Sequence, residues 1–272
     1  MNAAQALHTA ARQFCMDRFE FWCARYSQIA AKGRDRERDD YHYTPEALAT
    51  FPRYNVLRAI RVELERIEPA TLDDVDKTRD LTLHIGRTAE DAFTRPTLGP
   101  IAATAISEER TEFCEFVRGL SRSELSVVAL IPYRRVLADA ECKELWSRIC
   151  DRWQITDHYW YPLTECTRSD VVALRASQFE NSVSPDRLQS LLASRGVNRV
   201  WEIPEDGVAY EQDLSFFVPR YTGNEGYWSS GDLGWIVYAS HEDSITIGGW
   251  LLQELDKIWP GWRENLWVSE FT

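Results

Sequence analysis

The segment Tyr238–Asp243 holds the side chains best suited to chemistry in this sequence. Its alternation predicts a strand that ends in a hairpin turn, with His241 and Glu242 at the tip. A histidine titrates near neutral pH, and a neighbouring carboxylate can orient its ring. A hydrolase-like interpretation makes His241 a general base supported by Glu242 and Glu211. The sequence favours the other interpretation, a polar turn without catalytic function, and leaves the question of enzyme activity open.

Motifs for nucleotides and metal ions are absent from the sequence. It contains neither of the glycine-rich phosphate-binding motifs G-x-G-x-x-G and G-x-x-x-x-G-K-[ST]. The five histidines are dispersed, there is no C-x-x-C, and Ile245 stands where H-E-x-x-H would need its second histidine. We therefore expect no cofactor and no metal site, and we expect the six cysteines to be reduced thiols.

Acidic residues are concentrated near the C-terminus. Residues 201–272 contain 13 acidic and 3 basic residues together with seven of the eleven tryptophans, whereas residues 1–200 contain 30 acidic and 28 basic residues. A negative field repels the phosphates of nucleic acids and attracts a basic protein. The alternative is that the acids only keep a tryptophan-rich domain in solution.

The function that this pattern favours is non-catalytic binding of a basic protein, with inhibition of a toxin as one form of it. Carboxylates in predicted loops would steer the partner, and exposed aromatic side chains would anchor it. The predicted binding residues are Glu205, Asp206, Glu225, Tyr227, Trp228, Asp232, Glu242 and Asp243. The same aromatic residues could instead close the core of the domain.

Hydrophobic periodicity predicts an α+β protein. Residues 1–120 show helical spacing throughout, interrupted by a charged loop at Lys32–Asp40. Ser126–Ile131 is a short apolar run that is typical of a buried strand, and residues 235–247 predict an antiparallel hairpin. We expect a helical region, 1–120, packed on a mixed α/β region, 121–272. The two regions could share one continuous core because no long linker separates them.

The sequence also bears on location. No apolar run approaches the ~20 residues that span a bilayer, and charged residues interrupt the first 22 positions, so no signal peptide is expected. We therefore expect a cytoplasmic protein that does not engage membranes.

Three stretches carry a resemblance to known proteins. Pro132–Leu137, Tyr159–Leu163, and Tyr238–Glu242 with the following Gly248-Gly249 resemble uncharacterised cytoplasmic bacterial proteins. In its general character, the acidic and tryptophan-rich C-terminal quarter resembles the immunity proteins of bacterial toxin systems. That resemblance implies an inhibitory protein partner and assigns no individual residue.

Overall fold

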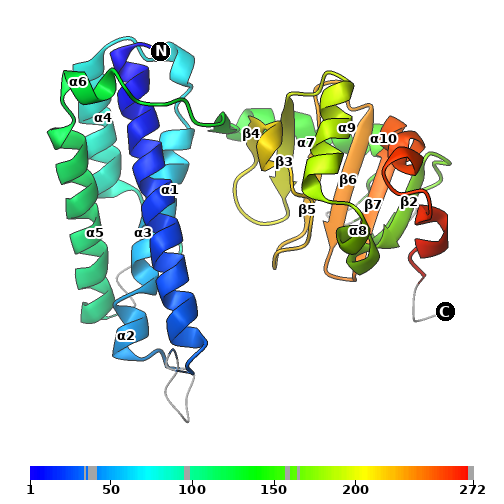
Figure 1. Ribbon diagram of the computed structural model, residues 1–272, viewed down its shortest axis with the longest axis horizontal. Helices are drawn as coiled ribbons and strands as arrows, with labels where there is room; N and C mark the ends of the chain where they lie inside the picture. The colour runs from blue at the N-terminus through cyan, green and yellow to red at the C-terminus, as the bar shows by residue number, and fades with distance from the viewer. Residues whose placement is uncertain (34, 36–41, 95–98, 157–159, 164–165, 269–272) are drawn as a thin grey trace. The chain divides into compact units, whose positions relative to one another are not determined.

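The computed structural model describes residues 1–33, 35, 42–94, 99–156, 160–163 and 166–268 (Figure 1). Most of the predicted loop Lys32–Asp40, and Tyr159 of the second resembling stretch, lie outside the described residues. The chain divides into two compact units, Met1–Ile131 and Pro132–Thr272. Helices form the first unit and an antiparallel sheet with helices forms the second, so the predicted α+β class is confirmed.

Four long helices form the first unit. They are α1 (Ala3–Ala30), α3 (Phe51–Glu65), α4 (Val75–Thr88) and α5 (Pro100–Gly119), accompanied by the short α2 (Pro45–Leu48), η1 (Pro69–Thr71) and α6 (Arg122–Leu125). Their apolar faces meet in one core, where Leu7, Leu57, Ile60 and Phe113 are fully buried. Polar side chains cap the starts of α1 and α4: Asn2 accepts the backbone N–H of Gln5, and Asp74 accepts the backbone N–H of Asp76 and Lys77.

A buried carboxylate connects side chains from three of these helices. Glu109 in α5 is fully buried and forms an ion pair with Arg18 of α1. The same carboxylate accepts the indole N–H of Trp22 at 3.1 Å and lies 3.5 Å from a guanidinium nitrogen of Arg53 in α3. A charge at this depth needs such partners, because an unpaired buried carboxylate is strongly destabilising.

The second unit contains a seven-stranded sheet. Its strands are β1 (Arg134–Val136), β2 (Val171–Arg175), β3 (Arg199–Pro204), β4 (Tyr210–Asp213), β5 (Gly226–Ser229), β6 (Trp235–Ser240) and β7 (Ser244–Gly249). They lie in the order β1-β4-β3-β5-β6-β7-β2, and every neighbouring pair is antiparallel. The predicted hairpin is confirmed as β6–β7, which closes with Ser240 opposite Ser244.

The predicted strand at Ser126–Ile131 is wrong. These residues form a turn and an irregular segment between α6 and β1, and the side chains of Val127 and Leu130 are each 80% exposed. An apolar, β-branched run forms a strand only where a neighbouring strand offers hydrogen-bond partners. The first strand of the sheet begins later, at Arg134.

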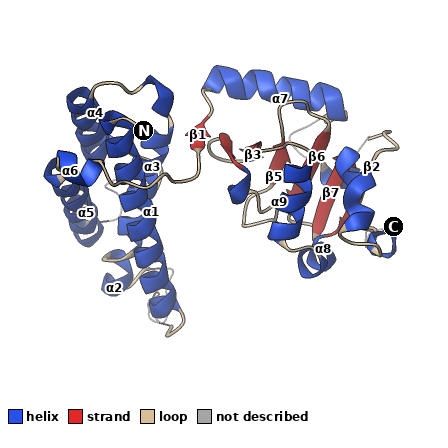
Figure 2. Cartoon of the chain, turned by 45° about the horizontal axis from the view of Figure 1, so that its top comes forward, coloured by secondary structure: helices blue, strands red, loops and turns tan. Residues whose placement is uncertain are grey.

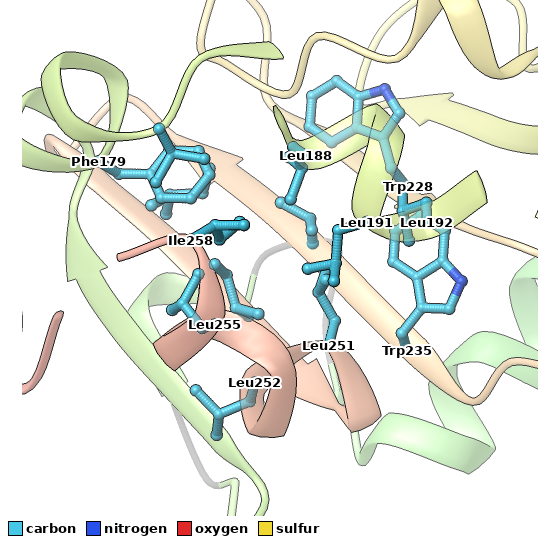
Figure 3. Packing of buried hydrophobic residues seen from close by; sticks show 14 of the residues in the cluster. Phe179, Leu188, Leu191, Leu192, Trp228, Trp235, Leu251, Leu252, Leu255 and Ile258 are labelled. Atoms are coloured by element: carbon cyan, nitrogen blue, oxygen red, sulfur yellow. The ribbon is translucent and has the colours of Figure 1, made fainter. Parts of the chain in front are cut away.

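Helices cover both faces of the sheet (Figure 2). On one face α7 (Asp139–Trp153) packs with Ile236 and Tyr238 of β6. On the other face Val237 and Ala239 pack with α8 (Ala176–Ser182), α9 (Pro185–Ser194) and α10 (Trp250–Glu254) (Figure 3). Short 3-10 turns complete the unit: η3 (Tyr161–Leu163), η4 (Leu214–Phe216), η5 (Leu255–Lys257) and η6 (Trp262–Asn265). A central strand covered on both faces presents neither set of side chains to solvent.

Candidate functional site

One end of the sheet gathers several of the predicted site residues. Antiparallel pairing sets the end of β3 beside the start of β5, and the start of β5 beside the end of β6. The loops that follow or precede these strand ends therefore meet there. We call this the acidic end; it comprises Glu205, Asp206, Glu225, His241, Glu242 and Asp243.

Glu225 lies beneath the surface of the acidic end. It is 3% exposed and accepts hydrogen bonds from the Tyr238 hydroxyl, from Ser240 Oγ at 3.0 Å and from the His241 backbone N–H at 3.3 Å. Burial alone would raise the pKa of Glu225, but the hydrogen bonds from Tyr238, His241 and Ser240 outweigh it and lower the pKa. The expectation that Glu225 is a surface residue for partner binding is wrong, because its carboxylate is already fully engaged.

His241 is held between two carboxylates. Its Nδ1 lies 2.5 Å from Oε1 of Glu225, and its Nε2 lies 2.9 Å from Oε1 of Glu242. The hydrogen bond to Glu225 raises the pKa of His241. Burial opposes this change, and the charges of Glu225, Glu242 and Glu205 add to the increase. The His241 side chain is 56% exposed. An exposed imidazole oriented by a buried carboxylate has the arrangement of a general acid or base.

Glu211 lies far from His241. It sits in β4, and its carboxylate forms ion pairs with Arg135 at 3.2 Å and Arg199 at 3.6 Å. Two strands, β3 and β5, separate β4 from β6, so at about 4.8 Å per strand the separation across the sheet is about 14 Å. The predicted support of His241 by Glu211 is therefore wrong, and Glu225 holds that position. In the sequence, Glu225 has no spacing relation to His241 that would reveal it; the pairing of β5 with β6 creates it.

Tyr227 and Trp228 are buried, contrary to their predicted role as exposed anchors. Both lie in the central strand β5, with 2% and 5% exposure. Tyr227 stacks on Tyr238 with ring centroids 4.5 Å apart. Trp228, labelled in Figure 3, belongs to the core on the opposite face, where it packs near Phe217. For these two residues the alternative interpretation, closure of the core, is the correct one.

Asp243 and Asp232 serve the fold locally. Asp243 accepts hydrogen bonds from the backbone N–H of Ser177 at 2.9 Å and from its hydroxyl at 3.0 Å, which caps the start of α8. Asp232 lies in the β5–β6 turn, where it accepts the N–H of Gly234 at 3.0 Å. The six residues of β6 separate this turn from the acidic end, a distance of about 20 Å. The six predicted acids therefore do not share one face.

Glu205 and Asp206 remain exposed in the loop between β3 and β4. Backbone hydrogen bonds hold this loop in place: the Glu205 N–H donates to the Glu225 carbonyl at 2.9 Å, and the Asp206 N–H donates to Asn224 Oδ1 at 3.3 Å. Across the part of the chain that the structure describes, no basic side chain forms an ion pair with either carboxylate. Both carboxylates thus face solvent.

A cavity of about 210 Å³ lies beside the acidic end, on the α7 face of the sheet. Its walls come from α7, from the end of β3 and from β5: Cys142, Lys143, Trp146, Ile203, Pro204, Glu205 and Tyr227. The sequence does not reveal this cavity, because helical spacing predicts that Trp146 faces the core and gives no sign of an opening beside it.

A larger cavity of about 360 Å³ lies near the β5–β6 turn, between the end of α9 and β3. It is lined in part by Arg195, Arg199 and Asp232. Both guanidinium groups already have carboxylate partners, since Arg195 pairs with Glu254 and Arg199 with Glu211. The positive charges beside this cavity are therefore already balanced by carboxylates of the same unit.

Within the described residues, no three His, Cys, Asp or Glu side chains are arranged to hold a metal ion. Among the helices described, none combines the length and the apolar character needed to cross a bilayer. Comparison of the chain with protein-family models, with curated proteins and with solved structures found no match.

Proposed function

We propose that this chain is a non-catalytic protein that binds a basic protein partner through the acidic end of its sheet, as an immunity protein binds its toxin. The observation that carries the proposal is the exposure of Glu205 and Asp206 on one ordered loop, without an internal ion pair among the described residues. Clustered carboxylates of this kind speed encounter with a cationic protein.

Charge pairing inside the second unit supports this location. Arginines neutralise several other acids of the C-terminal stretch: Arg134 lies 3.5 Å from Glu202, and Arg135 lies 3.2 Å from Glu211. Glu254 likewise pairs with Arg195 and Lys257. The negative charge left for a partner is therefore more localised than the composition of residues 201–272 indicates.

Two matched substitutions test the proposal. Asp206→Lys and Asp232→Lys make the same charge change in exposed loops at opposite ends of the sheet. The tagged wild-type protein is first used to isolate partners from its source cells. Association with the purified partner is then measured for both variants at several salt concentrations.

We expect a basic partner, association that slows as salt rises, and a loss of about tenfold or more in association rate for Asp206→Lys only. An acidic partner, or equal effects of the two substitutions, would contradict the proposal. Thermal unfolding of both variants checks that neither change acts through stability.

A second candidate function is general acid–base catalysis at His241. The observation in its favour is the 2.5 Å contact between His241 Nδ1 and the buried carboxylate of Glu225. Its test is a panel of ester, phosphate and amide substrates, with His241→Ala as the control. Turnover that disappears in His241→Ala supports this function, and turnover that survives the substitution argues against it.

A further inference from the structure

We propose that the cavity beside the acidic end receives an arginine side chain of the basic partner. This inference rests on the proposed function and adds the chemical group that the surface recognises. The cavity adjoins the charged loop between β3 and β4, because Glu205 belongs to both.

The size and walls of the cavity suit one long side chain. At about 210 Å³ it is smaller than the roughly 300–1,000 Å³ typical of small-molecule sites. The rings of Trp146 and Tyr227 meet at 64° with centroids 5.0 Å apart, which forms an aromatic corner. Ile203 and Pro204 supply apolar walls. Burial raises the pKa of Cys142, so its thiol stays neutral and adds to the apolar lining.

The charge at the mouth favours a cation. Glu205 lines the cavity, and Asp206 follows it on the same exposed loop. Among the described residues of the lining, Lys143 is the one that carries a basic side chain. A guanidinium can stack flat on an aromatic ring while its edge donates to a carboxylate, whereas the ammonium of lysine is a compact and strongly hydrated charge.

The chain itself uses this combination in several places, of which two have the shortest distance from guanidinium to ring. Arg134 lies over the ring of Tyr210 at 3.8 Å and also approaches Glu202 at 3.5 Å. Arg199 lies over the ring of Tyr133 at 3.8 Å and also pairs with Glu211. In the cavity, the aromatic rings and Glu205 are present, and there is no arginine among the described residues that line its walls. The partner would supply it.

The test compares three capped peptides, hexa-arginine, hexa-lysine and hexa-citrulline, by calorimetric titration of the full chain at low salt. Citrulline keeps the shape of arginine and removes its charge. We expect hexa-arginine to bind about three to ten times more tightly than hexa-lysine, and hexa-citrulline not to bind. Trp146→Ala should remove the preference for arginine while both cationic peptides still bind.

Two further variants keep the test decisive if Trp146→Ala unfolds. Glu205→Gln removes the charge at the mouth with little change in shape and should weaken hexa-arginine binding severalfold, whereas Asp232→Asn, far from the cavity, should not. Lys143→Ala should strengthen the binding of hexa-arginine.

The outcomes separate this inference from the proposed function. Equal affinity for arginine and lysine peptides, with both weakened by Glu205→Gln, overturns the arginine cavity and leaves the acidic binding surface standing. Tight binding of hexa-citrulline also overturns the inference, because the cavity would then not select a cation. Failure of both cationic peptides to bind contradicts the inference and the proposed function together.

Discussion

Nδ1 of His241 lies 2.5 Å from Oε1 of Glu225, and this contact joins the tip of the β6–β7 hairpin to the residue that precedes β5. Two loops that are 16 residues apart in the chain are thereby fixed to one another. The ring of His241 is held at one orientation, and the buried carboxylate acquires a partially exposed partner.

The first prediction concerns pH. The pKa of His241 is raised above 6.5, so the stability that it contributes is complete below pH 6.5 and is lost as pH rises through the raised pKa. The pKa of Glu225 is lowered below 4.5, so its contribution is complete above pH 4.5 and is lost as pH falls through the lowered pKa. The coupling between the two residues should therefore be greatest between pH 4.5 and 6.5.

The measurement is a double-mutant cycle of His241→Gln and Glu225→Gln, followed by urea unfolding across pH. A coupling free energy that grows toward pH 9 would show that the imidazolium form does not stabilise this contact.

The second prediction concerns the buried hydrogen bonds that Glu225 accepts. Glu225→Ala removes the acceptor for the Tyr238 and Ser240 hydroxyls, which are both buried. Leaving buried donors unsatisfied should lower the free energy of unfolding by about 3 kcal/mol. The exposed Glu205→Ala, on the neighbouring loop, should change it by less than about 0.5 kcal/mol. Similar losses for both variants in denaturant unfolding would mean that Glu225 is not an internal support.

The third prediction concerns Gly249. Its φ is +71°, and a Cβ added there would lie 2.1 Å from the carbonyl oxygen of Gly234. Gly249→Ala should therefore cost about 3 kcal/mol or more through backbone strain and a clash with the main chain. Gly231→Ala meets no atom within 4 Å and should be close to neutral. Equal melting temperatures for the two variants would show that Gly249 is not packed tightly against the backbone of Gly234.

The fourth prediction concerns the buried carboxylate of the first unit. Glu109→Ala leaves Arg18 and Arg53 without their shared acceptor, so the free energy of unfolding should fall by about 3–5 kcal/mol. Glu108→Ala, at the adjacent position, removes an exposed carboxylate that also pairs with Arg53 and should cost far less. Helical circular dichroism during thermal unfolding reports both, and a smaller loss for Glu109→Ala than for Glu108→Ala would be inconsistent with the ion-pair network.

The fifth prediction concerns the two units. Each has its own apolar clusters, and the segment between them exposes Val127 and Leu130. Residues 1–131 and 132–272, produced separately, should each unfold cooperatively. A fragment that shows no cooperative transition would indicate that its core needs the rest of the chain.

Local signals in the sequence predicted much of the fold. Thr44-Pro45 starts α2, Ser184-Pro185 starts α9, and the β6–β7 hairpin appears where alternation predicts it. Each of these features is decided within a few residues by capping or by side-chain alternation. One local signal misled: the apolar run Ser126–Ile131 predicts a strand but forms a turn and an irregular segment.

The candidate site was predicted only in part. The hairpin tip with His241 and Glu242 is local and was identified, whereas the role of Glu225 depends on the pairing of β5 with β6, which no spacing reveals. Tyr227 and Trp228 follow a glycine-rich segment that is typical of a loop, yet strand pairing on both sides places them in the middle of the sheet. Burial of these two residues depends on how β5 pairs with β3 and β6, and the pairing of strands that are distant in the chain cannot be read from one sequence.

The order of strands in the sheet has a consequence for synthesis on the ribosome. The first unit is complete at Ile131, so it can fold while the second unit is still emerging. In the second unit β2 pairs along its length with β7, so Val171 cannot pair until Gly248 has been made, and an isolated bridge joins Leu174 to the still later Leu266. Until translation passes that glycine, an unpaired apolar strand edge stays open, and the nascent chain depends on chaperones or on speed to avoid pairing with its neighbours.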